Sequence, residues 1–209
     1  MFRNHRRLLG TVVAVATIAV TPVLAQQPST EREPTKKDPL RFSAFAVQMQ
    51  GGGMSGVVDI TIERWSTDAE RQSIVALVKT TTDRPKDQDK LLTALQDIEP
   101  RVGFIRTPNS MGWDLKYAHE NKLSDGTRQI VIATDKPVSF LAARAQTRTM
   151  DYAFSLIEMR FPAGSDKGEG KLLGQSTLSV KDGKLQIEIY GQEPTRLTTI
   201  TEKKPKGEK

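Results

Sequence analysis

A short segment in the middle of the chain gathers side chains that could hold an anionic or sugar-like ligand. Arg106 lies at one end of this segment, and Trp113, Tyr117 and His119 follow it. An arginine donates paired hydrogen bonds to carboxylates and phosphates, while tryptophan and tyrosine combine an apolar body with a polar tip. Binding residues are often carried by loops on a rigid scaffold. These four residues are therefore our candidate binding residues.

The same residues also fit a purely structural interpretation. Trp113, Leu115 and Tyr117 alternate with other residues and would form the inward face of a strand. Arg106 would then be a surface charge at a strand end, and His119 a surface histidine near a turn. The sequence leaves both interpretations open.

Histidine and cysteine are too scarce for most familiar catalytic and metal centres. The chain has no cysteine and two histidines, and one of these, His5, lies in a segment that we expect to be removed. A cysteine nucleophile, a thiolate metal site and a disulfide framework are therefore excluded. With His119 as the remaining histidine, the sequence predicts no metal and no cofactor and assigns no catalytic residue.

Serine and carboxylate residues form no coherent catalytic motif either. Gly53-Met54-Ser55-Gly56 resembles part of a nucleophile elbow, but Val57 stands where the second glycine of that motif is required. A strand pattern follows these glycines, which favours a hairpin loop over a phosphate-binding loop at a helix start. No pair of acids is singled out by its spacing, so a carboxylate-based hydrolase, with or without His119, is kept as an alternative.

The first 25 residues have the pattern of a secretory signal. Three arginines precede an uncharged, mostly apolar run at 8–20, and Val23-Leu24-Ala25 places small residues at the cleavage positions. The run is shorter than the roughly 20 residues that span a membrane, so we expect cleavage before Gln26 and no transmembrane span afterwards. The protein would then be exported to the periplasm or the cell exterior. A retained anchor and, from Arg6-Arg7, a twin-arginine signal are the alternatives.

The net charge of +6 gives little information about partners. Its excess lies mainly in the signal and in the lysine-rich segment 203–209, while residues 40–201 hold 21 basic and 20 acidic side chains. A nucleic-acid partner would require a basic patch on the folded part of the chain. We therefore expect no nucleic-acid partner.

Hydrophobic periodicity predicts a sheet with an inserted pair of helices. Apolar and polar residues alternate over 57–63 and 185–189, and Asp182-Gly183 indicates a hairpin turn. Thr67-Asp68-Ala69-Glu70 has the spacing of a capping box, and apolar residues at helical spacing continue until Pro100. Short connections favour antiparallel pairing. The predicted fold is α+β: a mostly antiparallel curved sheet or partly closed barrel of about nine strands with an inserted two-helix unit.

Composition predicts the domain organisation. Residues 1–25 are the expected signal peptide, and the proline-containing segment 26–39 is an expected flexible leader. Residues 40–202 form a single expected α+β domain, in which 139–145 could be a short helix. Residues 203–209 are an expected basic tail.

Four blocks of sequence carry a resemblance to known proteins. They are ERWSTDAER (63–71), RVGFIRTP (101–108), GWDLKYA (112–118) and IVIATDKPVSF (130–140). These blocks resemble a family of exported bacterial proteins without an assigned function, and the resemblance covers most of residues 40–201. It implies no activity, ligand or catalytic residue.

These observations lead us to expect an exported, non-catalytic binding or interaction domain, and the sequence does not identify its ligand. A lipocalin-like barrel that holds an apolar ligand inside is one version. The alternatives are the carboxylate-based hydrolase and a structural module of the cell envelope. The expected partner is a small ligand or an envelope protein, and the sequence does not indicate an oligomeric state.

Overall fold

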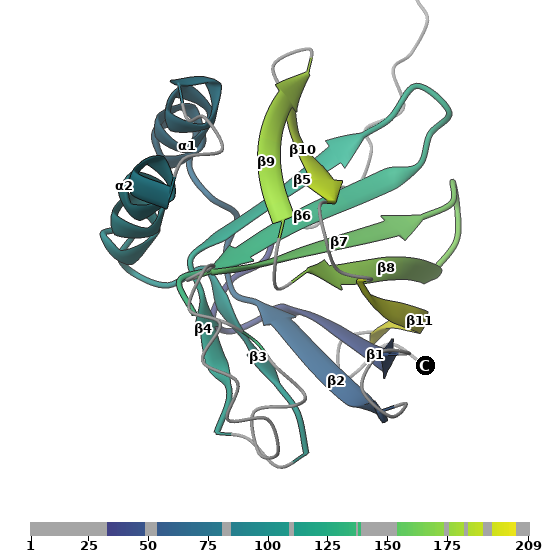
Figure 1. Ribbon diagram of the computed structural model, residues 1–209. Coiled ribbons are helices and arrows are strands. Elements are labelled where there is room, and N and C mark those ends of the chain that lie inside the picture. The colour runs from purple at the N-terminus through teal and green to yellow at the C-terminus, as the bar shows by residue number, and fades with distance from the viewer. Residues whose placement is uncertain are drawn as a thin grey trace, which may run out of the picture. The chain divides into compact units, whose positions relative to one another are not determined.

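The strands build one large antiparallel sheet that nearly closes on itself (Figure 1). The computed structural model describes residues 33–48, 54–80, 85–108, 111–136, 138, 154–173, 176–181, 184–189 and 194–203. Nine strands form this sheet in the order β4-β3-β2-β1-β11-β8-β7-β6-β5. Their bounds are β1 (Leu40–Gln48), β2 (Met54–Ile62), β3 (Gly103–Arg106), β4 (Trp113–Leu115), β5 (Tyr117–Lys122), β6 (Arg128–Thr134), β7 (Ser155–Phe161), β8 (Lys167–Leu173) and β11 (Thr195–Lys203).

Strand β1 pairs with the last strand, β11, while the other neighbouring strands follow one another along the chain apart from two insertions. Helices α1 (Asp68–Thr80) and α2 (Pro85–Gln96) lie between β2 and β3, and the strands β9 (Ser176–Lys181) and β10 (Lys184–Ile189) lie between β8 and β11. β9 and β10 pair with each other, with Lys181 opposite Lys184, which confirms the predicted hairpin; its turn residues lie outside the described part of the chain. The predicted α+β sheet with an inserted helix pair is confirmed, and the predicted helix at 139–145 also lies outside the described residues.

A single stretch of chain supplies both edges of the sheet. Only Lys116 separates β4, which pairs with β3, from β5, which pairs with β6. The Lys116 amide donates to the carbonyl of Ala133 in β6 at 2.9 Å, and the Val102 amide donates to the carbonyl of Leu115 at 2.9 Å. The two edge strands, β4 and β5, are thus two halves of one bent strand. Continuity of this kind is how an antiparallel sheet removes its open edges.

Lys116 acts as a bulge at this bend. Leu115 belongs to the interior apolar cluster, whereas Tyr117 belongs to the cluster beneath the helices, so the alternation of faces is interrupted between them. The buried ammonium of Lys116 points toward the end of α2. Its Nζ donates to Gln96 O at 3.4 Å and Ile98 O at 3.2 Å, and pairs with Glu99 Oε1 at 2.8 Å. These acceptors satisfy a charge that would otherwise be costly to bury.

Large apolar side chains meet in the interior of the sheet. Phe42 of β1 and Phe161 of β7 lie with ring centroids 5.6 Å apart, and both are almost completely buried. Every strand of the sheet from β1 to β8, and β11, contributes to this cluster; its other members include Leu40, Val58, Ile60, Ile62, Ile105, Leu115, Ala118, Ile130, Ile132, Ile157, Met159, Leu172, Leu197 and Ile200. These apolar side chains make up the interior cluster, and the polar candidate residues Tyr117 and His119 lie outside it.

One end of the interior is crossed by an ion cluster. The Arg128 guanidinium makes two bonds of 3.0 Å with the Glu120 carboxylate and one of 2.8 Å with Glu202, and it lies 5.5 Å from the Phe161 ring centroid. These residues come from β6, β5, β11 and β7. The cluster therefore ties four strands together where the apolar interior ends.

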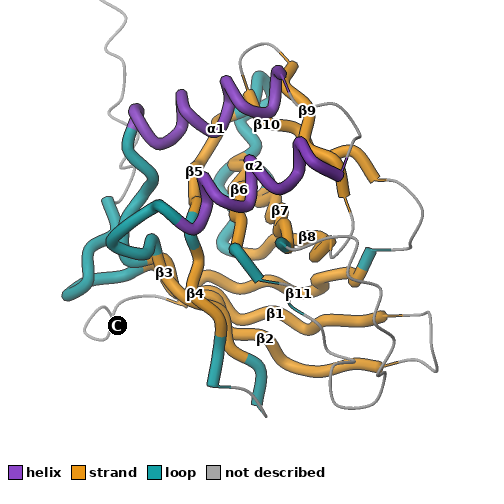
Figure 2. The backbone as a smooth tube through the Cα atoms, turned by 60° about the vertical axis from the view of Figure 1, so that its left-hand side comes forward, coloured by secondary structure: helices purple, strands orange, loops and turns teal. Residues whose placement is uncertain are grey.

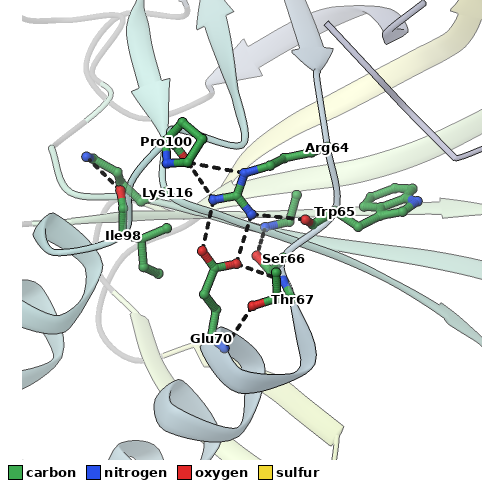
Figure 3. A network of polar contacts seen from close by, with 9 residues as sticks. Arg64, Trp65, Ser66, Thr67, Glu70, Ile98, Pro100 and Lys116 are labelled. Carbon is green, nitrogen blue, oxygen red and sulfur yellow. Dashed lines mark hydrogen bonds and ion pairs between the residues drawn. The ribbon is translucent and has the colours of Figure 1, made fainter.

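Two helices cover the outer face of β5 to β8 (Figure 2). The predicted capping box begins α1: the Thr67 amide donates to Glu70 Oε2 at 2.7 Å, and the Glu70 amide donates to Thr67 Oγ1 at 3.2 Å. Arg64 holds the same glutamate through two bonds of 2.9 Å and also donates to the carbonyl of Pro100, beyond the end of α2 (Figure 3). The start of α1 and the exit from α2 are therefore fixed at one point beside the sheet.

Replacing Lys116 by methionine tests the role of the bulge. Methionine fills a similar volume but leaves the Gln96 and Ile98 carbonyls without their donor. We expect the free energy of unfolding to fall by about 2 kcal/mol, measured by urea denaturation. Lys122→Met, at an exposed position of β5, should change it by less than about 0.5 kcal/mol. Equal effects of the two substitutions would contradict a special role for Lys116.

Candidate functional site

The four candidate residues from the sequence lie in two different places. Trp113 packs against the interior cluster, and Arg106 is exposed on the outer face of β3. Tyr117 and His119 lie instead on the outer face of β5. The structure therefore brings Tyr117 and His119 together, and separates them from Arg106 and Trp113.

The bulge at Lys116 decides the orientation of Tyr117 and His119. An uninterrupted strand would have pointed Tyr117 inward together with Trp113 and Leu115, as the structural interpretation of the sequence expected. With Lys116 as an extra residue, Tyr117 packs beneath Ile74 and Val78 of α1. Tyr117 is 2% exposed, and His119, two residues further along the same face, is half-buried.

Arg71 of α1 completes a cluster with Tyr117 and His119. It precedes the buried residues Ile74 and Val78 by three and seven positions, so it continues the apolar stripe of the helix by one turn. A helix stripe that faces a sheet normally carries an apolar side chain at this position. Arg71 instead places a positive charge against the outer face of β5, close enough to act electrostatically on both Tyr117 and His119.

The guanidinium of Arg71 is incompletely satisfied. In the described part of the chain, its Nε is a buried nitrogen with no hydrogen-bond partner. Its ion pair with Asp68 spans 3.8 Å from Nε to Oδ1, and the Asp68 side chain is 88% exposed, which makes this a weak pair. The described residues also provide no recorded hydrogen bond to the Tyr117 hydroxyl or the His119 ring. Since buried polar groups are almost always bonded, the buried Nε of Arg71 points to a missing partner, and Tyr117 and His119 are further donors beside it.

The electrostatics of this donor cluster (Arg71, Tyr117 and His119) favour neutral side chains beside one cation. Burial raises the pKa of Tyr117 far above its ordinary range, so its hydroxyl keeps its proton. Burial lowers the pKa of His119, and the positive charge of Arg71 lowers it further, against opposing effects of Asp68 and Glu120. The site therefore holds one positive charge and two neutral groups, each of which can donate a hydrogen bond.

A row of polar side chains continues along the same face of the sheet. Asn121 donates to Gln129 Oε1 at 3.4 Å, and Gln129 donates to Glu158 Oε1 at 2.6 Å. The same carboxylate pairs with Arg160 at 2.7 Å. This row crosses β5, β6 and β7 and is satisfied internally, in contrast to the donor cluster.

The structure describes no metal centre and no membrane-spanning helix. Among the described residues, no three histidine, aspartate or glutamate side chains are grouped so that they could hold a metal ion. No helix in the described ranges is long and apolar enough to cross a membrane.

Sequence reasoning found Tyr117 and His119 but missed Arg71. The signal was present in the spacing of Arg71 to Ile74, Val75 and Val78, which places a charge within an apolar helical stripe. The sequence could not show which strand this stripe covers. That pairing depends on the closure of the sheet, which brings β5 beneath α1.

Comparisons of the chain with protein-family models, curated proteins and solved structures found no match. The function is therefore argued from the site itself.

The lowered pKa of His119 predicts a specific pH dependence of stability. In the unfolded chain this histidine takes up a proton near its ordinary pKa of 6.5, whereas in the folded protein it stays neutral to lower pH. The free energy of unfolding should therefore fall as the pH drops below about 6.5 and continue falling to the folded-state pKa. His119→Gln should remove this part of the dependence, as measured by urea denaturation between neutral and mildly acidic pH. Identical pH profiles of the wild type and the variant would show that His119 is not shifted.

Proposed function

We propose that this chain is an exported, non-catalytic binding domain that holds a small anionic ligand at the donor cluster. The observation that carries the proposal is a buried guanidinium nitrogen of Arg71 without a hydrogen-bond partner, beside the side chains of Tyr117 and His119, to which the described residues give no hydrogen bond. Arg71 supplies the positive charge, and Tyr117 and His119 supply neutral donors on the adjacent strand. A ligand that offers only acceptors and carries negative charge complements all three.

A carboxylate suits the cluster best among small anions. A guanidinium binds a carboxylate through two parallel N–H donors, and a neighbouring hydroxyl can donate to the same oxygens. Apolar side chains adjoin the donors, since Ile74, Val75 and Val131 belong to the neighbouring cluster. The ligand would therefore combine one carboxylate with an apolar body, as most small-molecule sites favour.

The arrangement supports binding rather than catalysis. A general base is usually oriented by a hydrogen bond from its ring to an acid. The described residues give His119 no such bond, and its lowered pKa reflects burial and the proximity of a cation. Export is supported by the signal pattern of the first 25 residues.

Thermal and urea unfolding with a panel of small carboxylates and inorganic phosphate tests this proposal. A carboxylate present at about 100 times its Kd should raise the free energy of unfolding by about 2.7 kcal/mol. Native mass spectrometry of the purified protein should in addition detect any retained ligand. If no carboxylate or phosphate stabilises the protein and none is retained, the proposed site is wrong. Hydrolysis of an ester or glycoside that disappears in His119→Gln would favour the hydrolase instead.

Arg71→Met gives a sharper test because it separates stability from binding. Methionine restores the apolar stripe and removes an unsatisfied buried nitrogen, so we expect the ligand-free variant to be more stable by about 1 kcal/mol. The same variant should lose the stabilisation by carboxylates. Arg41→Met, at an exposed position of β1, is the control and should keep that stabilisation. A less stable Arg71→Met protein would indicate that Arg71 serves the fold.

A further inference from the structure

The outer face of β3, β2, β1 and β11, together with the Lys167–Lys171 part of β8, forms a second surface, which we term the open wall. Helices α1 and α2 pack on the outer side of β5 to β8, through residues such as Tyr117, Leu156 and Leu173. The outward-facing residues of the open wall are largely exposed, and Figure 1 shows both helices on the other side, away from β1 and β2. This surface does not include the donor cluster.

Exposed apolar side chains gather on the open wall. Outside β9 and β10, the large apolar side chains described as exposed are Phe45 at 44%, Val57 at 43% and Met111 at 99%. Phe45 and Val57 are direct cross-strand partners in β1 and β2. Val57 lies two residues from Asp59, and Asp59 lies opposite Arg106, the last residue of β3, in the strand register. Met111 belongs to the loop that follows β3. The three side chains therefore lie toward the same end of the wall.

The open wall carries an excess of positive charge. Three of its acids form ion pairs: Asp59 pairs with Lys203 at 2.9 Å, and Arg101 pairs with Glu63 at 3.2 Å and Asp114 at 2.7 Å. Glu169 of β8 is exposed and has no ion pair among the described residues. Several exposed cations have no recorded ion pair within the described residues, and they come from β1, β3 and β8: Arg41, Arg106, Lys167 and Lys171. The domain as a whole is nearly neutral, but its charges are distributed asymmetrically, with an excess of positive charge on the open wall.

Arg106 is held in place without being neutralised. Its guanidinium lies 4.7 Å from the centroid of the Phe104 ring, and Arg101 lies 5.0 Å from the same centroid. The backbone of Gly112 lies against the Arg106 stem so closely that a methyl group there would come within 2.8 Å of Cγ. A stacked, exposed guanidinium of this kind is preorganised for phosphate or carboxylate groups.

We propose that the open wall docks the protein onto an anionic lipid bilayer. The cations are spread over several strands instead of converging on one point, which suits a surface of many phosphate groups more than a single acidic side chain. The exposed apolar side chains beside them can enter the headgroup region, as in other interfacial proteins. Arg106 and Arg41 supply the electrostatic contact, and Phe45, Val57 and Met111 supply the apolar one.

Vesicle sedimentation tests this docking directly. The full chain should bind vesicles of phosphatidylcholine that contain phosphatidylglycerol, bind pure phosphatidylcholine vesicles much more weakly, and dissociate as the salt concentration rises. The double variant Arg41→Gln/Arg106→Gln should bind the anionic vesicles about 25-fold more weakly, since each basic residue near a membrane contributes about fivefold in affinity. Lys79→Gln/Lys122→Gln removes the same charge elsewhere and should bind like the wild type. Equal loss in both double variants, or equal binding to both vesicle types, would overturn the proposal.

A second measurement separates the bilayer from other partners and from the proposed function. Phe45→Trp should show a blue-shifted fluorescence increase with anionic vesicles, relative to the wild type, because the side chain leaves water. Arg71→Met should bind vesicles normally even if it loses every small ligand, since it lies on α1. If the protein forms dimers that Phe45→Ser/Val57→Ser disperses, the wall is an interface between two copies and the lipid proposal is wrong.

Discussion

The bend at Lys116 is the constraint on which the rest of the structure depends. At this residue one strand leaves β3 and joins β6, and the sheet closes because the same strand forms both of its edges. The bulge also changes which face each later residue of the strand occupies, so Tyr117 and His119 lie on the outer face. The buried ammonium then ties the bend to the carbonyl groups at the end of α2. Sheet closure, helix placement and the composition of the donor cluster are therefore consequences of one local irregularity.

The helix pair is placed from its two ends rather than by packing alone. Arg64 joins the capping carboxylate of α1 to the carbonyl of Pro100, and its bonds to Glu70 lower the pKa of that carboxyl group. Ser66 links the same connection to β5, since its amide donates to Ala118 O and its hydroxyl accepts from the Ala118 amide. The stripe of α1 is thereby held over β5 with Arg71 at its first turn. The charge of Arg71 thus lies where a helix stripe that faces a sheet normally carries an apolar side chain.

The two surfaces of the sheet have different characters because only one of them is covered. The covered side buries polar groups among apolar ones, so a hydrogen-bond donor without a partner there costs free energy. The open wall keeps its charges in water, where single ion pairs contribute little and the net charge governs what approaches. Arg106 belongs to this second surface, although the sequence placed it beside Tyr117 and His119.

The sequence by itself determined the local elements. The capping box of α1, the hairpin of β9 and β10, the helix pair and the antiparallel strands all follow from short-range rules of spacing, and the structure confirms them. Tertiary structure alone decided where the strands close, that Tyr117 faces outward, and that Arg71 meets it. The physical reason is that alternation predicts faces only until a bulge changes their order, and a bulge is stabilised by distant groups. For Lys116 these groups are the carbonyls of Gln96 and Ile98, about twenty residues away in the sequence and adjacent only in the folded protein.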